Sequence, residues 1–156
     1  MKRLLKPLLA GAVTVCAVTL TCYLTTAPGR VIATVGSQRG VLDVQRGEEA
    51  GVPLAAPEGA AERPVWEFDD RDGGAPIVNK ASGLCLTATP VGSSRMDDCA
   101  DRTSQVWRRQ ADRSGSVTLV NRAFGERCLE LRSLYSAVRV SACDGSPQQK
   151  WRLRSP

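Results

Sequence analysis

The sequence contains no histidine, and this absence limits the chemistry that the chain can perform. Because a Cys-x-x-Cys pair is also absent, the usual ligand sets of a zinc site are missing, and we expect no metal and no cofactor. No Gly-x-Ser-x-Gly nucleophile motif occurs either. The adjacent acids Asp69-Asp70 and Asp97-Asp98 stand beside glycine and cysteine, where aspartate more commonly forms turns. The sequence therefore predicts a protein that is not an enzyme and has no catalytic residues.

Charge is missing from residues 7–29, which follow three basic residues near the N-terminus. The apolar body of this segment is longer than a usual signal-peptide core and close to the lower limit for a membrane-spanning helix. Residues 1–29 are therefore predicted to form an apolar helix that is either a cleaved signal peptide or a signal anchor, with residues 8–26 in the membrane if uncleaved. Since basic flanks stay cytoplasmic, the remainder is expected to be extracytoplasmic, either anchored with its N-terminus inside or secreted.

The basic character of the chain depends largely on that N-terminal flank. Without its three basic residues, 18 Lys and Arg stand against 16 Asp and Glu, so the formal net charge falls from +5 to +2. In the C-terminal KWRLR, basic side chains alternate with apolar ones, which is typical of a strand with one solvated face. We therefore expect no nucleic-acid partner.

What the sequence does contain is an internal repeat. IVNKASGLCLTA, beginning at Ile77, matches LVNRAFGERCLEL, beginning at Leu119. In both copies a second cysteine follows, and a Gln-x-Trp motif places its tryptophan eight residues after that cysteine. A third, more divergent copy precedes them, with RGVLDV at residues 39–44 and PVWEF at residues 64–68. A repeat of this length indicates one supersecondary unit used three times.

Helical periodicity over three turns is absent beyond residue 29. Short β-type runs such as VTLVN and VRVSAC are separated by clusters of Gly, Ser, Asp and Pro. Three units of four short strands predict an all-β closed barrel with a hairpin cap. The units are expected at about residues 30–71, 72–113 and 114–156. Because each of the last two carries its own cysteine pair at matching offsets, the repeat favours the disulfides Cys85–Cys99 and Cys128–Cys143 among the three possible connectivities.

With these motifs established, residues 30–156 resemble the ricin B-type β-trefoil family, whose three repeats begin with a Cys-Leu-Asp-like motif and end with Gln-x-Trp. The resemblance implies a β-trefoil of three repeats, preceded here by the N-terminal apolar helix. It also implies that the Gln-x-Trp residues are structural rather than sugar-binding. These residues are Gln105, Trp107, Gln149 and Trp151, with Trp66 in the first repeat.

In this family an acid after Cys-Leu, an aromatic before the second cysteine and a polar side chain before Gln-x-Trp form a shallow sugar pocket. The carbohydrate-binding candidates are Glu130, Tyr135 and Gln148 in the third repeat and Asp43 in the first. Tyr135 lies in the loop after Glu130, and the usual aromatic position of the third repeat, near Ser141, is empty. The second repeat has Thr87 at the acidic position and is expected to be silent.

Together with the N-terminal segment and the missing catalytic motifs, the resemblance predicts an extracytoplasmic, non-catalytic carbohydrate-binding module with degenerate sites that binds glycan weakly. The alternative is a β-trefoil scaffold that binds a cell-envelope protein and no sugar, because a fold does not determine a function.

Overall fold

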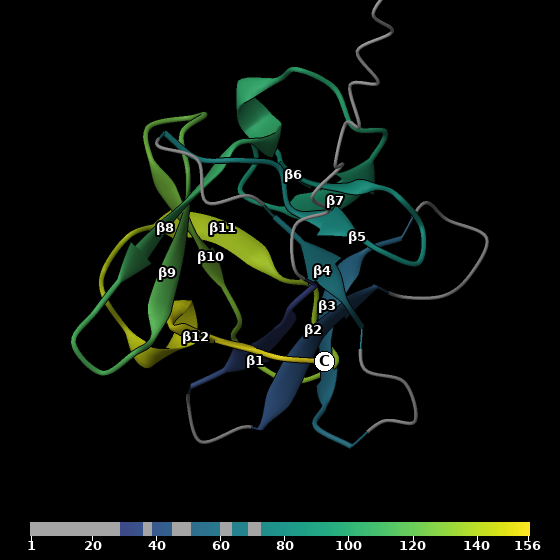
Figure 1. The fold of residues 1–156 in the computed structure, drawn as a ribbon. Coiled ribbons are helices and arrows are strands. Elements are labelled where there is room, and N and C mark those ends of the chain that lie inside the picture. The colour runs from purple at the N-terminus through teal and green to yellow at the C-terminus, as the bar shows by residue number, and fades with distance from the viewer. Residues whose placement is uncertain (1–28, 36–38, 45–50, 60–63, 69–72) are drawn as a thin grey trace, which may run out of the picture.

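The computed structural model of the 156-residue chain describes residues 29–35, 39–44, 51–59, 64–68 and 73–156 (Figure 1). The predicted membrane or signal segment, residues 8–26, lies outside the described residues. Within the described ranges, no helix combines the length and the apolarity needed to cross a membrane.

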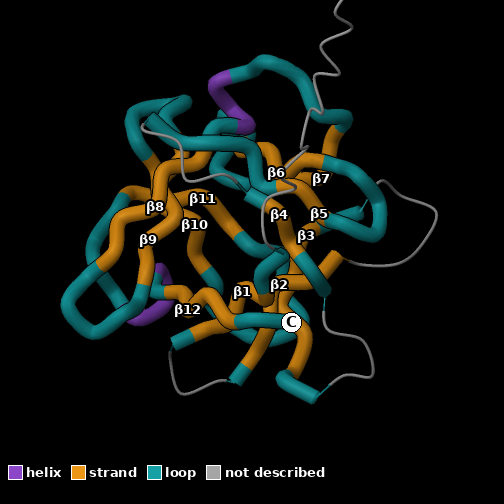
Figure 2. The backbone as a smooth tube through the Cα atoms, in the orientation of Figure 1, coloured by secondary structure: helices purple, strands orange, loops and turns teal. Residues whose placement is uncertain are grey.

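Short strands and two single-turn 3-10 helices make up the described chain (Figure 2). The first repeat contains β1 (Val31–Thr34), β2 (Gly40–Val44), β3 (Pro53–Pro57) and β4 (Trp66–Glu67). The second contains β5 (Val78–Asn79), β6 (Cys85–Ala88), β7 (Ser94–Asp97), η1 (Thr103–Gln105) and β8 (Trp107–Ala111). The third contains β9 (Val117–Asn121), β10 (Arg127–Glu130), β11 (Arg139–Ala142), η2 (Pro147–Gln149) and β12 (Trp151–Arg154). The all-β prediction of four strands in each unit agrees with this order.

A six-stranded barrel forms from the first and last strand of each repeat. Antiparallel pairs join β12 to β1, β4 to β5, β8 to β9 and β9 to β12. The two remaining seams are closed by the bridges Arg30–Trp66 and Ala75–Trp107. Because the first and third repeats pair through β1 and β12, no repeat completes the barrel without the other two.

The second and third strands of each repeat form a hairpin, namely β2–β3, β6–β7 and β10–β11. Backbone hydrogen bonds between repeats join these hairpins into a cap. The donors and acceptors are Met96 N to Gly51 O at 3.2 Å, Val138 N to Pro53 O at 2.8 Å and Val140 N to Gly92 O at 3.0 Å. The turn at Gly92 therefore lies against the third hairpin, which places the second repeat beside the surface of the third.

The core takes equivalent side chains from each repeat. Every unit supplies an aliphatic residue from its first strand or directly before it, a leucine from its second and a tryptophan from its fourth, and all are at most 2% exposed. The sets are Ile32, Leu42 and Trp66; Ile77, Leu86 and Trp107; and Leu119, Leu129 and Trp151. Burial of three such sets in one cluster accounts for the association of the repeats, since each tryptophan alone removes on the order of 200 Å² from water.

One hydrogen bond recurs in all three units. The indole Nε1 of each tryptophan donates to the backbone carbonyl of the leucine in the second strand of the same repeat. The distances are 3.0 Å from Trp66 to Leu42, 2.8 Å from Trp107 to Leu86 and 3.0 Å from Trp151 to Leu129. The fourth strand of each repeat is thereby tied to the cap hairpin of the same repeat, and the buried indole N–H is satisfied.

Because Trp151 both fills the core and donates this bond, we expect its substitution by Ala to lower the free energy of unfolding more than its substitution by Phe. Trp151→Ala should lower the free energy of unfolding by about 3–5 kcal/mol because it empties a large core volume. Trp151→Phe keeps a ring but leaves the Leu129 carbonyl without its donor, and should cost about 1–3 kcal/mol. Urea unfolding followed by circular dichroism measures both, with the exposed Tyr135→Phe as a control expected within about 0.5 kcal/mol. A Trp151→Phe protein as stable as the wild type would contradict a role for the hydrogen bond.

Candidate functional site

The glutamine of each Gln-x-Trp motif is fully buried and holds the chain around the second cysteine. In the second repeat Gln105 Oε1 accepts from Ala100 N at 2.7 Å and Nε2 donates to Asp98 O at 2.9 Å. In the third repeat Gln149 Oε1 accepts from Asp144 N at 3.0 Å and Nε2 donates to Ala142 O at 2.7 Å. Each glutamine therefore clamps the peptide groups on both sides of its cysteine.

The same glutamines reach the position after Cys-Leu, where the resemblance placed a sugar-binding acid. Gln105 Nε2 donates to the Thr87 hydroxyl at 3.0 Å, and Gln149 Nε2 lies 3.3 Å from Glu130 Oε2. Thr87 is buried and itself donates to Cys85 O at 3.2 Å. The position after Cys-Leu is thus part of the glutamine network in both repeats.

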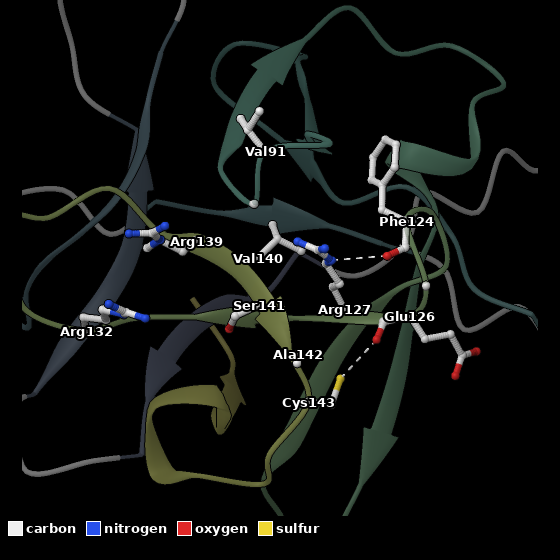
Figure 3. Close-up of a pocket in the computed structure, with 12 residues that line it drawn as sticks. Val91, Phe124, Glu126, Arg127, Arg132, Arg139, Val140, Ser141, Ala142 and Cys143 are labelled. Atoms are coloured by element: carbon white, nitrogen blue, oxygen red, sulfur yellow. Dashed lines mark hydrogen bonds between the residues drawn. The ribbon is translucent and has the colours of Figure 1, made fainter.

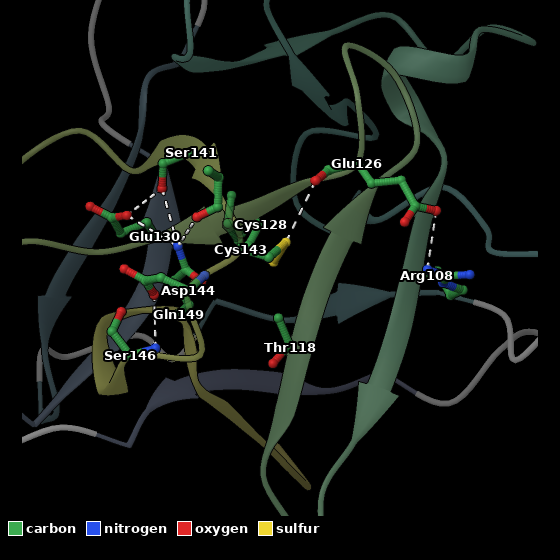
Figure 4. Close-up of a disulfide and its surroundings, with 12 residues drawn as sticks. Arg108, Thr118, Glu126, Cys128, Glu130, Ser141, Cys143, Asp144, Ser146 and Gln149 are labelled. Atoms are coloured by element: carbon green, nitrogen blue, oxygen red, sulfur yellow. Dashed lines mark hydrogen bonds and ion pairs between the residues drawn. A yellow bond between two sulfur atoms is a disulfide. The ribbon is translucent and has the colours of Figure 1, made fainter.

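Glu130 is buried at the end of β10, and both of its carboxylate oxygens have partners within the chain. Figure 4 shows two of these partners, Ser141 and Gln149. Oε1 accepts from Arg132 Nε at 2.8 Å, and Oε2 accepts from the Ser141 hydroxyl as well as from Gln149. A saccharide hydroxyl would have to compete with these three donors for the carboxylate.

The network also determines the acidity of Glu130. Burial by itself raises the pKa of the carboxyl, but hydrogen bonds from Ser141, Arg132 and Gln149, together with the nearby Arg132 charge, outweigh it. The pKa of Glu130 therefore lies below its ordinary value, and the carboxylate is ionised in the folded protein at neutral pH.

Both predicted disulfides are confirmed. Cys85 and Cys99 are bonded with Cα atoms 5.0 Å apart, and Cys128 and Cys143 with Cα atoms 5.1 Å apart. Each bond closes the loop whose end the glutamine of the same repeat clamps (Figure 4). In the second and third repeats, the chain that follows the cap hairpin is therefore held at its cysteine both by the disulfide and by the hydrogen bonds of the glutamine.

The other sugar-binding candidates lie apart from Glu130. Asp43 is half-buried in β2, and its Oδ1 accepts from the adjacent Val44 N at 2.8 Å. Tyr135 is 73% exposed in the β10–β11 connection, where its N donates to Ala55 O at 2.8 Å. Gln148 is exposed in η2, and its backbone carbonyl accepts from Leu131 N. The structure brings Glu130 together with Gln149 and Ser141, and it places neither Tyr135 nor Gln148 on the cavity described next.

A cavity of about 710 Å³ lies over the outer side of the third hairpin (Figure 3). Its walls come from β11 and the following residues, from the loop that precedes β10, and from the turn of the second repeat. The lining residues are Val91, Gly92, Phe124, Gly125, Glu126, Arg127, Arg132, Arg139, Val140, Ser141, Ala142 and Cys143. Phe124, which is 43% exposed, supplies an aromatic ring, and three arginines supply guanidinium groups.

The Phe124 loop differs from its counterpart in the second repeat by one inserted residue. Six residues separate Asn121 from Cys128, whereas five separate Asn79 from Cys85. Phe124, Gly125 and Glu126 have φ of 57°, 87° and 53°. Such left-handed backbone is uncommon for a bulky residue, and here the turn carries Phe124 outward to the cavity.

Sequence reasoning missed Phe124, Arg127 and Arg139 as site residues. The signal was present in the longer spacing between asparagine and cysteine in the third repeat. Spacing alone, however, does not show that the turn at Gly92, from another repeat, completes the wall.

Comparison with known proteins agrees with this fold. Residues 63–138 match the family model described as a ricin-type beta-trefoil lectin domain-like family. A 77-residue segment is 36% identical to part of alpha-galactosidase A of Aspergillus niger. The match covers 48% of this chain and 13% of that protein. The chain therefore matches only a small part of this relative's length.

Two solved structures resemble nearly the whole described chain. The designed three-fold symmetric protein ThreeFoil superposes with a TM-score of 0.72 at 18% identity, covering 82% of this chain and 99% of ThreeFoil. SeviL, solved with asialo-GM1 saccharide, superposes with a TM-score of 0.64 at 15% identity, covering 83% of this chain and 98% of SeviL. At these identities the likeness shows the β-trefoil fold alone.

Loss of one disulfide should weaken the third repeat measurably. The double variant Cys128→Ser with Cys143→Ser should lower the free energy of unfolding by about 3 kcal/mol, since the closed loop spans 15 residues. Intact-mass measurement of native wild-type protein after alkylation should show no label on the four cysteines of the two bonds. Labelling of all four would refute the pairing, and an unchanged unfolding midpoint in the variant would refute the contribution to stability.

The lowered pKa of Glu130 predicts that the stability difference between wild type and Glu130→Gln depends on pH. Because its folded pKa is lowered, its contribution is complete above the unfolded carboxyl pKa of about 4.3 and is lost as pH falls through the folded pKa. Glu130→Gln should therefore destabilise the protein by about 1–3 kcal/mol at pH 7 and by less at pH 3. Urea unfolding at both pH values measures this, with the exposed Glu126→Gln as a control of small effect. An equal loss at both pH values would contradict the electrostatic account.

Proposed function

Because this chain folds as a ricin B-type β-trefoil, we propose that it is an extracytoplasmic carbohydrate-binding module without catalytic activity. The observation that carries this proposal is the cavity over the third hairpin, with the exposed ring of Phe124 at its wall. Saccharide sites combine an aromatic surface, which covers the apolar C–H face of a sugar ring, with polar groups that bond its hydroxyls. Phe124 and the neighbouring arginines and Ser141 provide both.

The extracytoplasmic part of the proposal is supported by the disulfides and by the N-terminal sequence. Disulfides persist in oxidising compartments, and two of them stabilise this domain. The charge-free residues 7–29 with their basic flank are typical of an export or anchoring segment. Both features favour a domain that acts outside the cytoplasm, either released or attached to the membrane.

The side chains at and near the cavity support a non-catalytic role. Histidine is absent from the chain, and the cysteines of the described residues 73–156 are in disulfides. Glu130 and Glu126, the acids beside the cavity, are each paired with an arginine, at 2.8 Å and 3.2 Å. The pKa of the Glu130 carboxyl is lowered, whereas a general acid at neutral pH needs a raised one.

The alternative is a scaffold for a cell-envelope protein, and one observation favours it. The acid that the family resemblance assigns to sugar recognition, Glu130, is committed to Arg132, Ser141 and Gln149. If sugar recognition depended on that carboxylate, the third repeat would bind weakly. The cavity favours carbohydrate binding over the scaffold, because it offers a sugar-sized site that does not depend on the Glu130 carboxylate.

A glycan array probed with the purified protein tests carbohydrate binding. A single open site is expected to bind weakly, so the glycans should be displayed at high density to gain avidity. Phe124→Asn should abolish the signal, whereas Tyr135→Asn should leave it unchanged. The two form a matched pair, since both positions have φ near +60° and asparagine accepts that conformation.

Each outcome of the array is informative. A signal lost in Tyr135→Asn and retained in Phe124→Asn would move the site to the loop predicted from the sequence. No binding to any glycan by protein with a native circular dichroism spectrum would refute the lectin proposal and favour the protein-binding scaffold.

A further inference from the structure

We propose that the cavity of the third repeat selects acidic saccharides, which carry a carboxylate or a sulfate group. This inference rests on the proposed carbohydrate-binding function and adds the chemical class of the ligand.

Positive charge at the cavity exceeds the negative charge that could neutralise it. Arg132 is paired with Glu130 at 2.8 Å, and Glu126 is paired with Arg108 at 3.2 Å. Among the described residues, Arg127 and Arg139 have no ion-pair partner. Two guanidinium groups therefore line the cavity without a compensating carboxylate, and an anion that enters it would find donors whose charge is not already satisfied.

The second repeat shows what an arginine at the position of Arg139 does when a carboxylate is present. Arg95 lies opposite Thr87 in the β6–β7 ladder, as Arg139 lies opposite Glu130 in the β10–β11 ladder. Arg95 donates to Asp97 at 2.8 Å. The equivalent of Asp97 is Ser141, whose hydroxyl is bonded to Glu130. The third repeat thus lacks the neutralising acid of the second, which leaves the Arg139 guanidinium available to a ligand.

Arg127 is held in place before any ligand binds. Its Nε donates to Phe124 O at 3.2 Å (Figure 3). Its Nη1 also lies close to the turn of the second repeat, 3.4 Å from where a Cβ on Gly92 would stand. Gly92 therefore leaves room for the guanidinium, and less side-chain entropy is lost when Arg127 binds an anion.

The positions of these groups suit a sugar acid. Phe124 and Arg139 lie on opposite sides of the cavity, with Arg127 between them (Figure 3). A pyranose ring resting on Phe124 would direct an acidic substituent toward the arginines. Guanidinium groups bind carboxylate and sulfate oxygens through parallel N–H donors, a geometry that a neutral hydroxyl cannot match.

The test is an array carrying neutral, carboxylated and sulfated versions of the same backbone glycans. We expect the acidic versions to bind about tenfold or more tightly than their neutral parents, as charge-assisted hydrogen bonds would give. The preference should be lost in Arg139→Gln, reduced in Arg139→Lys and retained in the matched control Arg95→Gln. It should also weaken as the salt concentration rises. The carboxylated and sulfated arms report which oxyanion the cavity prefers.

Failure of this inference can be distinguished from failure of the proposed function. Equal binding of neutral and acidic glycans, or a preference that survives Arg139→Gln, would overturn the acidic class and leave carbohydrate binding in place. Absence of binding to every glycan by folded protein would overturn both.

Discussion

The fold depends on the hydrogen bond between a tryptophan indole and a leucine carbonyl, repeated in each unit. It joins the last strand of a repeat to its second strand, and so couples the barrel to the cap. Because the three tryptophans also pack in one core cluster, each unit requires the other two for burial. The first repeat retains its tryptophan bond although it lacks the cysteine pair and the Gln-x-Trp glutamine. The indole contact is therefore the constraint common to all three units.

The second layer of the structure is the clamp formed by glutamine and disulfide in repeats two and three. The backbone partners of Gln105 and Gln149 correspond closely, but the side-chain partner differs, being the Thr87 hydroxyl in one repeat and the Glu130 carboxylate in the other. The position after Cys-Leu can thus hold either a neutral threonine or a charged glutamate beside the glutamine amide, while the backbone contacts of the glutamine stay the same. The consequence lies at the surface, because the third repeat then recruits Arg132 and Ser141 to the carboxylate.

The second and third repeats differ at two places beside the cavity. One inserted residue before Cys128 produces the left-handed turn that exposes Phe124 and begins β10 with Arg127. At matched positions the second repeat has Asp97, which pairs with Arg95, and the third repeat has Ser141. Among the residues that the structure describes, Arg139 has no ion-pair partner. These two differences create an open, positively charged cavity on a barrel whose core is nearly three-fold symmetric.

The sequence by itself determined the three-unit all-β architecture and the two disulfide pairs. Those features follow from short-range spacing, because apolar residues, cysteines and Gln-x-Trp recur in register and local order places them on equivalent strands. Only the tertiary structure decided the environment of each candidate site residue. Glu130 looked like a free ligand-binding acid, yet Gln149, nineteen residues away, and Ser141 hold it within the network. Likewise the cavity wall at Gly92 comes from another repeat through its bond to Val140. Such contacts join residues that are not neighbours in the chain, so the packing of hairpins and repeats against one another, rather than local pattern, sets them.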